Sequence, residues 1–569
     1  MTATTRAARR DDELHSIRTA GRTTVLIIGG GINGISLFRD LALQGVNAVL
    51  VERGDFGGGA SAASSHMIHG GIRYLENGEF RLVRESVQER NGLLRTAPHY
   101  VKPLQTTIPI YSTFSGILSA PLRFLTHRSG KPQERGAVLI KAGLTIYDTF
   151  SRDGGSVPRH RFLGRRRSLS ELPALDPDIK YTATYYDASM HDPERLALDV
   201  LQDGRTAHPS SFAVNYLEAV GRDGDTVVLR DRETAEEFRI AADVVVNTSG
   251  PWTDLTNEAL GATTRFMGGT KGSHIVLDHP ELFAATQGRE IFFEHSDGRI
   301  VLIYPLKGRV LVGTTDIDAD PREPARCTED EIDYFFDLIT HVFPGIEVTR
   351  QQIVYRFSGI RPLPRHEDTA PGFVSRDYRI ELDRNGDVPL LSLVGGKWTT
   401  FRALGEALSD RVLQLLGRPR VVSTVGLPIG GGRGFPRTVR ARKSWKQTNL
   451  PDAGARGDQL LARYGTRSAE VWAHIRRGQD SPLADGALST RELGWMVDDE
   501  LVVRLADVIL RRTAIAFVGD TTTAVLEEVA DALADLMGWD DERRDAEVEA
   551  TVQLLNEAHG LSLAVPARG

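Results

Sequence analysis

The stretch that most constrains this chain is an apolar strand that runs directly into three spaced glycines. Residues 25–28 predict a buried strand, residues 35–44 predict a helix, and the turn between them has the spacing G-x-G-x-x-G, with glycines at Gly29, Gly31 and Gly34. A second predicted strand, residues 47–51, leads to Glu52, roughly 20 residues beyond the glycines. Strand, glycines, helix, strand and acid in this order predict a βαβ unit that binds a dinucleotide.

Each glycine in this turn has its own physical task. Gly29 permits the tight turn, Gly31 lets a pyrophosphate approach the backbone because it has no Cβ, and Gly34 lets the helix pack closely on the strand. The N–H groups at the helix N-terminus can then bind the anion. Glu52 is placed to accept hydrogen bonds from ribose hydroxyls, and its charge disfavours a 2′-phosphate, so NADP is the poorest candidate. Glycines alone would fit an ordinary tight loop, but the flanking elements favour a nucleotide.

No second copy of this fingerprint occurs in the sequence. A flavoprotein that also uses a nicotinamide cofactor normally carries two nucleotide sites. A single site therefore fits an enzyme whose substrate reduces a bound flavin directly.

Composition bounds the class of protein. The chain has 569 residues, 41% hydrophobic and 25% charged, and no apolar run approaches the ~18 residues of a membrane-spanning helix. This length predicts about three domains, or two with large insertions. The net charge of -7 gives no reason to expect nucleic acid. The single cysteine, Cys327, excludes an internal disulfide and a cysteine metal cluster, and it points to a reducing compartment.

A segment rich in small residues follows the second strand and carries candidate catalytic side chains. It spans residues 57–75, with small residues in its first half, where backbone must lie against a ligand, and then His66, His69, Arg73 and Tyr74. Its Gly-Ala-Ser-Ala-Ala run misses the G-x-S-x-G nucleophile pattern because alanine replaces the last glycine. The two histidines lack a third ligand at a useful spacing, which argues against a metal site.

Several stretches are notably basic. Residues 1–22 are rich in arginine and lack the apolar core of a secretory signal, so we predict a flexible tail. Residues 114–150 mix apolar clusters with basic residues, and residues 159–167 add another basic cluster. Such segments can lie on an anionic membrane surface. The competing interpretation is an ordinary packed helix with a solvated charged face.

Later segments predict further strands and a second anion site. Residues 210–246 favour antiparallel strands, and residues 241–252 favour a buried strand that ends in small residues. Residues 395–400 follow another strand and open a helix, which suits an anion, although they lack the Walker A pattern. A glycine-rich break at residues 430–434 precedes a C-terminal portion with helical periodicity.

Taken in order, these motifs resemble those of FAD-dependent glycerol-3-phosphate dehydrogenases, a family of the D-amino-acid-oxidase-like flavoproteins. Besides the glycine turn, the resemblance rests on Ser64–Tyr74, Asn247–Trp252, Lys271–His274, Gly313–Asp316, Ser358–Leu363 and Gly395–Lys397. It extends from about residue 22 nearly to the end of the chain, and residues 498–517 resemble the family's C-terminal helical domain. The chain departs from the family at Thr248 and Ser249, where Ala-Thr is usual.

The resemblance implies an α/β fold in which a Rossmann-like FAD-binding domain is interleaved with an antiparallel β-sheet substrate domain and followed by an all-helical C-terminal domain. We expect the interleaved domains over residues 23–430, with the substrate part mainly at 100–215 and 262–370, and the helical domain over 431–569. The implied reaction is oxidation of sn-glycerol 3-phosphate to dihydroxyacetone phosphate, by hydride transfer to FAD and electron transfer to a membrane quinone. The implied protein is a cytoplasmic homodimer bound peripherally to the inner face of the cell membrane.

The resemblance also assigns site residues. A dianionic phosphate needs cations and strong donors, and the implied substrate-binding residues are Arg73, Tyr74, His274, Arg361 and Lys397. Catalytic candidates are His69, His274 and Arg361; we prefer His69 as the base, with His274 as the alternative, because a neutral imidazole beside Arg73 suits that task. The implied cofactor-binding residues are Gly29, Gly30, Gly31, Ile32, Asn33, Gly34, Glu52, Arg53, Ser61, Ser64, Ser65, His69, Gly70, Gly71, Ser249, Gly250, Trp252, Gly359, Gly396, Lys397, Trp398 and Thr399.

Other functions compete with this prediction. The cations recognise the phosphate end and leave the length of the polyol open, so another polyol phosphate, such as erythritol 4-phosphate, is an alternative substrate. An oxidase that passes electrons to oxygen is a second alternative. A flavin-binding redox sensor without turnover belongs to a different class, and the full set of charged site residues argues against it.

Overall fold

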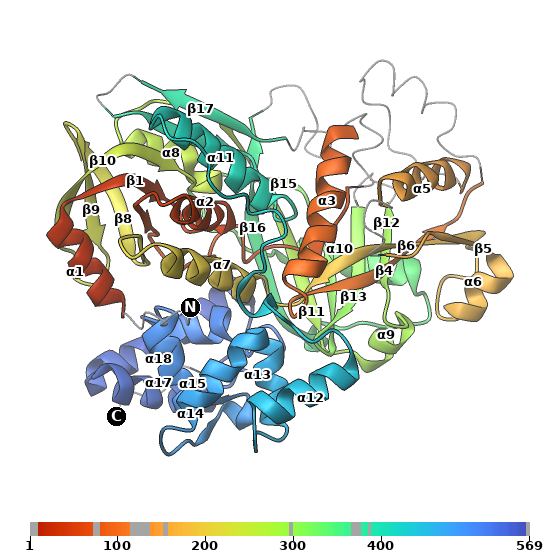
Figure 1. Cartoon of the computed structure of the whole chain (residues 1–569). Helices are drawn as coiled ribbons and strands as arrows, with labels where there is room; N and C mark the ends of the chain where they lie inside the picture. The colour runs from red at the N-terminus through yellow and green to blue at the C-terminus, as the bar shows by residue number, and fades with distance from the viewer. Residues whose placement is uncertain are drawn as a thin grey trace.

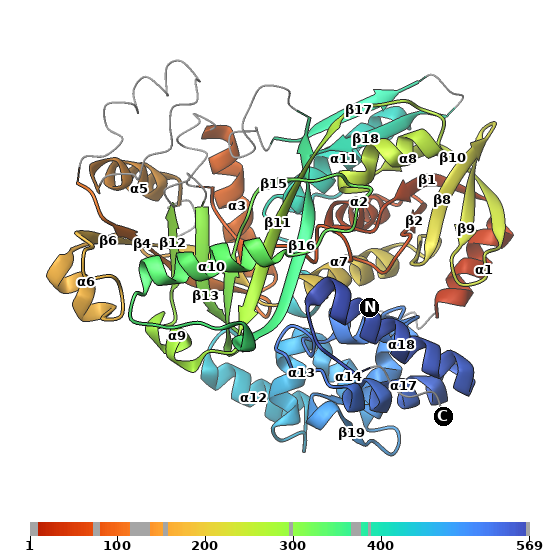
Figure 2. The ribbon, with the colours of Figure 1, turned by 180° about the vertical axis from the view of Figure 1, so that it is seen from behind.

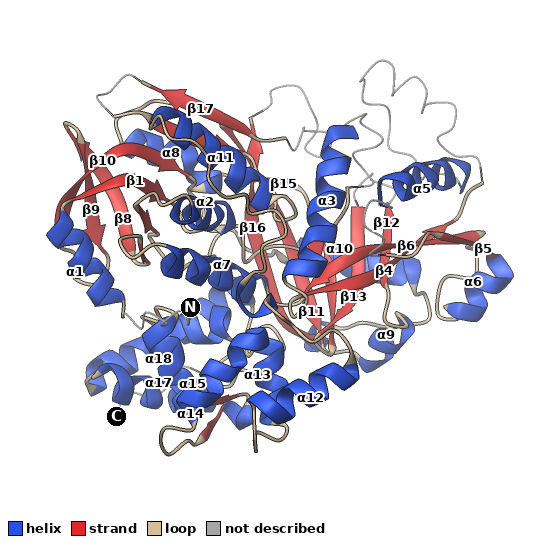
Figure 3. Cartoon of the chain, viewed as in Figure 1, coloured by secondary structure: helices blue, strands red, loops and turns tan. Residues whose placement is uncertain are grey.

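A computed structural model describes residues 9–71, 80–113, 137–151, 157–294, 300–365, 377–384 and 388–564. Two large sheets lie side by side, and a group of C-terminal helices packs below them in Figure 1. Figure 3 shows that strands are concentrated in the two sheets, whereas the C-terminal part is almost entirely helical.

The first sheet contains the glycine turn. Its strand order is β17-β18-β10-β1-β2-β7, and β8 and β9 extend it as an antiparallel hairpin on β10. β1 lies between β2 and β10 and runs parallel to both, so their carboxyl ends meet at one edge. The strands are β1 (Arg22–Ile28), β2 (Ala48–Val51), β7 (Phe212–Val214), β8 (Leu217–Asp223), β9 (Thr226–Asp231), β10 (Glu237–Asn247), β17 (Arg379–Asp383) and β18 (Leu390–Val394).

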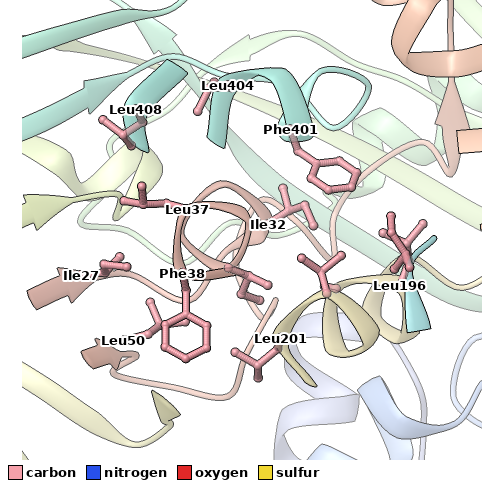
Figure 4. Packing of buried hydrophobic residues seen from close by; sticks show 14 of the residues in the cluster. Ile27, Ile32, Leu37, Phe38, Leu50, Leu196, Leu201, Phe401, Leu404 and Leu408 are labelled. Atoms are coloured by element: carbon pink, nitrogen blue, oxygen red, sulfur yellow. The ribbon is translucent and has the colours of Figure 1, made fainter. Parts of the chain in front are cut away.

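Helices α2 (Ile32–Leu43), α7 (Pro193–Ala207) and α11 (Phe401–Leu415) pack together on this sheet. Phe38 of α2 is fully buried, and Figure 4 shows it beside Leu50 of β2 and Leu201 of α7. A Cβ at Gly204 of α7 would come within 2.7 Å of the Phe38 ring. Glycine at that position therefore allows the close spacing of α7 and α2.

The second sheet is mostly antiparallel and has the order β15-β11-β14-β13-β12-β4-β6-β3, with β16 paired to β11 and β5 to β6. Figure 2 shows α10 (Glu329–Val342) lying across it. Helices α3 (Phe80–Thr96) and α5 (Ala137–Ser151) cover another part of it. The strands are β3 (Met67–Ile68), β4 (Val101–Ile110), β5 (Arg161–Gly164), β6 (Tyr181–Met190), β11 (Met267–Leu277), β12 (Glu290–Glu294), β13 (Ile300–Leu306), β14 (Arg309–Gly313), β15 (Ile317–Asp318) and β16 (Ile353–Pro364).

Apart from α12, the C-terminal helices share one hydrophobic cluster that includes residues of the second sheet, such as Tyr304 and Phe357. The C-terminal helices are α12 (Val439–Asn449), α13 (Arg456–Tyr464), α14 (Ser468–Ile475), α15 (Thr490–Asp499), α16 (Leu505–Asp507), a π-helical turn (Val508–Arg512), α17 (Thr523–Met537) and α18 (Asp541–His559). Short strands β19 (Pro482–Leu483) and β20 (Leu488–Ser489) form a hairpin among them. Remaining short helices are α6 (Arg165–Glu171), α8 (Thr253–Ala259) and α9 (Pro280–Ala285). Across the described ranges, no helix has the length and apolar character needed to cross a bilayer.

The flexible tail predicted for residues 1–22 is wrong where the structure describes it, because Arg10–Ala20 form helix α1. Arg10 and Glu13 of this helix are buried. Arg10 pairs with Asp231 at 2.5 Å and Glu13 pairs with Arg205 at 2.7 Å, so both charges are neutralised by residues distant in sequence. Residues 1–8 lie outside the described ranges.

One boundary of the predicted substrate part also needs correction. Strands β4, β5 and β6, which end at residue 190, belong to the second sheet, but α7 packs on the first sheet and β7 belongs to it, where β7 pairs in parallel with β2. That part of the substrate region therefore ends near residue 190 rather than 215. The strands between 267 and 364 do belong to the second sheet. The division at residue 430 stays a prediction.

Candidate functional site

The glycine turn has the close packing that its sequence predicts. Gly29 adopts a φ of 108°, which a side chain rarely tolerates. A Cβ at Gly34 would overlap the carbonyl oxygen of Gly29 and come within 2.5 Å of Thr248 Oγ1. That hydroxyl lies 2.9 Å from the Gly29 carbonyl oxygen, so β10 closes the turn from the other side. Any side chain at position 34 would push α2 away from β1.

Glu52 is fixed at the end of β2 by backbone donors. Its Oε2 accepts the Gly30 N–H at 2.7 Å, and its Oε1 accepts the Gly54 N–H at 2.8 Å. Burial raises the pKa of Glu52, while these two hydrogen bonds oppose the rise. Each carboxylate oxygen has a further lone pair, so a ribose hydroxyl can still donate to it.

Ser61 joins the small-residue segment to the turn. Its Oγ accepts the Ile32 N–H at 3.0 Å, and its carbonyl oxygen accepts the Trp398 indole N–H at 2.9 Å. Gly396 lies against Asn33, since a Cβ at position 396 would come within 2.5 Å of Asn33 Nδ2. The two predicted anion sites, at the glycine turn and at residues 395–400, are therefore adjacent. Thr399 is buried beside them.

These residues fit a bound dinucleotide. At the turn, backbone atoms occupy positions where side chains would clash. Gly31 is the N-cap residue of α2 and makes no side-chain hydrogen bond to the backbone N–H groups of the helix's first turn. Asn33 Oδ1 is buried and has no hydrogen-bond partner among the described residues. A buried amide oxygen without a partner is costly in a finished fold, and a donor group of a bound ligand would satisfy it.

A second group of cofactor candidates lies at the end of β10. The Arg53 guanidinium stacks over the Trp252 ring, 4.6 Å from its centroid. The Trp252 indole N–H donates to the Pro321 carbonyl at 2.8 Å. Ser249 Oγ donates to Asn247 Oδ1 at 2.6 Å, and Gly250 adopts a φ of 64° as the chain turns.

His274 is the best-defined histidine of the site. It is 2% exposed, its Nε2 lies 2.8 Å from Ser65 Oγ, and its ring stacks on Phe357 with centroids 4.8 Å apart. Burial, and then the positive charge of Arg361, hold the pKa of His274 well below its usual value. The imidazole is therefore neutral at physiological pH.

Arg361 lies beside this histidine on β16 and is held in a fixed orientation. It donates to Asp316 Oδ1 at 2.7 Å, to Thr314 Oγ1 at 3.0 Å and to the Thr315 carbonyl at 2.8 Å. A Cβ at Gly272 on β11 would lie 2.6 Å from Arg361 Cζ, so glycine there makes room for the guanidinium. Thr314 and Asp316 were absent from the predicted site, although their Gly-Thr-Thr-Asp motif was visible in the sequence.

The segment around His69 is positioned by residues that the sequence analysis missed. The Gly70 N–H donates to Asp187 Oδ1 at 2.8 Å, and Asp187 pairs with the fully buried Arg90 at 2.9 Å. Tyr147 also donates to Asp187 at 2.8 Å. Asp187, the one charged residue in the otherwise uncharged strand at 181–190, was the available signal.

Most of the remaining predicted site residues lie in described parts of the chain. Gly359 packs directly on Ala63, which brings β16 against the small-residue segment. His69 is half-buried, and Gly71 adopts a φ of 76°. Lys397 lies close enough to Glu85 of α3 to lower the pKa of that carboxyl, against the larger effect of burial, which raises it. Arg73 and Tyr74 lie outside the described residues.

The chain is similar in sequence to FAD-dependent oxidoreductases and to dehydrogenases of polyol phosphates. The sequence profile described as "FAD dependent oxidoreductase" matches residues 24–411, and that of the "C-terminal domain of alpha-glycerophosphate oxidase" matches residues 422–544. The chain is 32% identical to a glycerol-3-phosphate dehydrogenase of Synechocystis over 555 residues, covering 92% of this chain and 95% of the relative. It is also 32% identical to a D-erythritol 1-phosphate dehydrogenase of Brucella abortus over 508 residues, covering 86% and 93%.

The fold has a solved counterpart. The crystal structure of glycerol-3-phosphate dehydrogenase from Bacillus halodurans, complexed with FAD, matches with a TM-score of 0.75 and 23% identity. The match covers 97% of this chain and 98% of that one.

Proposed function

Since the chain belongs to the family of FAD-dependent oxidoreductases that includes the glycerol-3-phosphate dehydrogenases, we propose that it oxidises sn-glycerol 3-phosphate to dihydroxyacetone phosphate. Its cofactor is FAD, and the fold class and the enzyme class predicted from the sequence are confirmed. We propose a membrane quinone as the electron acceptor and a homodimer bound peripherally at the inner face of the cell membrane.

The observation that carries this proposal is the pairing of a fixed cation with a neutral histidine beside the FAD-binding segment. Arg361 and His274 share one cluster on the second sheet, and Ser65 and Ala63 link that cluster to the segment that continues to Ser61 at the glycine turn. A guanidinium in a fixed orientation suits a phosphate dianion. Lys397 and, by resemblance, Arg73 and Tyr74 complete the proposed phosphate site.

The chemistry requires that the hydroxyl on carbon-2 lose a proton while carbon-2 loses a hydride. Bound FAD supplies the hydride acceptor. We propose His69 as the base, because the low pKa of His274 makes that imidazole a weak proton acceptor. His274 then binds substrate as a neutral ring held by Ser65 and Phe357.

Substitution of the two histidines is expected to separate these roles. His69→Asn should slow flavin reduction by roughly 10²-fold or more, the usual range for a lost general base. His274→Asn should mainly raise the substrate concentration needed for half-maximal reduction. Stopped-flow reduction of the flavin over a range of substrate concentrations measures both quantities. A larger loss of the limiting rate in His274→Asn than in His69→Asn would make His274 the base.

The substrate and the acceptor are tested by steady-state assays. With a dye as acceptor, we expect sn-glycerol 3-phosphate to be oxidised faster than erythritol 4-phosphate, and unphosphorylated glycerol to be inert. Faster turnover of the erythritol phosphate would reassign the substrate. Because the Brucella relative is a D-erythritol 1-phosphate dehydrogenase, D-erythritol 1-phosphate belongs in the same assay. Stoichiometric peroxide with oxygen as the only acceptor would identify an oxidase.

The membrane proposal predicts co-sedimentation with anionic liposomes, and a protein left in the supernatant would refute it.

A further inference from the structure

Asp55 is a buried carboxylate in the loop between Glu52 and Ser61, and both ends of this loop touch the glycine turn. Two arginines of the C-terminal part converge on it. Arg512 binds in a fork, with Nη1 2.5 Å from Oδ2 and Nη2 2.9 Å from Oδ1, and Arg511 Nε lies 2.5 Å from Oδ2. Burial alone would raise the pKa of Asp55, but the two guanidinium groups hold it well below its usual value.

The loop transmits this anchoring directly to the nucleotide turn. The Gly57 N–H, two residues after Asp55, donates to the Gly30 carbonyl at 2.9 Å. Phe56 packs on the same residue, since a Cβ at Gly30 would come within 2.7 Å of its ring. The position of Asp55 therefore determines where the backbone of Gly30 lies, and Gly30 is also the residue whose N–H binds Glu52.

Apolar packing on the C-terminal side of the loop is incomplete. A cavity of about 120 Å³ lies between the loop and the C-terminal helices, and its walls include Gly58, Gly59 and Phe517 beside the charged groups of Asp192, Lys307 and Arg511. Side chains across a cavity cannot fix the loop by contact. The ion pairs of Asp55 therefore connect the other end of the loop to the C-terminal part.

We propose that Arg511 and Arg512 are positioning residues for FAD: through Asp55 they hold the loop 53–61 in the conformation that binds the dinucleotide. The C-terminal part thus completes the cofactor site of the first sheet without touching the cofactor. This inference does not depend on which polyol phosphate is oxidised.

The chain offers a matched control. Arg195 of α7 pairs with Glu500 of the C-terminal part at 2.5 Å, and both side chains are as buried as the Asp55 pair. This ion pair spans the same two parts of the molecule, but Arg195 belongs to α7 and not to the loop. Arg512 also donates to the Glu500 carbonyl oxygen at 2.8 Å, a backbone contact that Arg195→Gln leaves in place, so the loss of Arg195 reports the cost of breaking a buried ion pair while the ion pairs of the loop stay intact.

The test compares Arg512→Gln and Asp55→Asn with Arg195→Gln in the full-length protein. Apoprotein is titrated with FAD, binding is followed by quenching of flavin fluorescence, and the Tm of each apoprotein is recorded. We expect the first two variants to raise the Kd for FAD by about tenfold or more. Arg195→Gln should lower the Tm comparably and leave the Kd within about twofold. Equal increases in Kd for Arg512→Gln and Arg195→Gln, or an unchanged Kd in Arg512→Gln, would overturn the proposal.

Two further variants keep the test decisive if Arg512→Gln does not fold. Arg512→Lys retains the charge and loses the fork, and Arg511→Gln removes the less buried arginine and leaves Arg512 in place. Both should fold and show an intermediate Kd. A wild-type Kd in both would contradict the proposed role.

Discussion

Replacing Arg361 with leucine is expected to reduce kcat/KM for sn-glycerol 3-phosphate by roughly 10²- to 10³-fold, the usual cost of removing one partner of a buried charged pair. The guanidinium is oriented by Asp316 and Thr314 before substrate arrives, so little of its binding energy is lost in ordering the side chain. Arg361→Lys should recover only part of the loss, because an ammonium keeps the charge but cannot reproduce the fork. Initial rates of dye reduction over a range of substrate concentrations measure the effect.

The control for Arg361 lies on the same strand. Arg356 of β16 precedes Phe357, the residue that stacks on His274, and therefore points to the opposite face of the strand, where it pairs with Glu329 at 2.9 Å. Arg356→Leu should thus leave kcat/KM nearly unchanged. The flavin spectrum of each variant should match that of the wild type, which separates loss of substrate binding from loss of cofactor. Equal losses of kcat/KM in the two leucine variants would show that Arg361 acts through folding and not through the phosphate.

Gly34→Ala is expected to yield protein that is purified largely without FAD. The added methyl group would overlap the Gly29 carbonyl oxygen, which is backbone and cannot rotate away. Alanine normally stabilises a helix relative to glycine by about 1 kcal/mol, so a loss at this position can only come from steric displacement of α2. The ratio of flavin to protein absorbance in the purified sample gives the occupancy.

Gly92 of α3 provides the control for Gly34, because it is also a glycine inside a helix. No heavy atom lies within 4 Å of a Cβ built there, and Gly92→Ala should retain full flavin occupancy. Removing the Thr248 hydroxyl in a Gly34→Ala background should not restore binding, because the backbone overlap remains. Normal flavin occupancy in Gly34→Ala would show that the turn has more room than the structure gives it.

The glycine turn was predictable because all its determinants are local. Strand, glycines, helix and Glu52 lie within 30 residues and obey simple periodicities, so each could be placed from the sequence. The same holds for the strand that precedes Gly395. The motifs that carry the family resemblance are short and contiguous for the same reason, so they are recognisable in the sequence itself.

Contacts between distant residues could not be predicted in this way. Ser65 and His274 are 209 positions apart, and Asp55 and Arg512 are 457 apart, so neither pair leaves a local signal. Helix α1 was missed for the same reason. Its charged sequence matches that of a solvated tail, and the partners that neutralise Arg10 and Glu13 lie about 200 residues away.

The boundary of the substrate part was missed because sheet membership depends on pairing and not on composition. β7 is a short apolar strand that could join either sheet, and only its parallel pairing with β2 assigns it to the first. α7 follows β6 directly in sequence but packs on α2, so the chain crosses between sheets near residue 190.

We propose that a polyol phosphate bound at Arg361 reduces FAD held at the glycine turn. The most direct test of this proposal is the visible absorption spectrum of the purified protein, recorded anaerobically before and after addition of sn-glycerol 3-phosphate. We predict an oxidised flavin spectrum that is bleached by sn-glycerol 3-phosphate and unchanged by glycerol. A flavin spectrum that no polyol phosphate bleaches would contradict the proposed reaction.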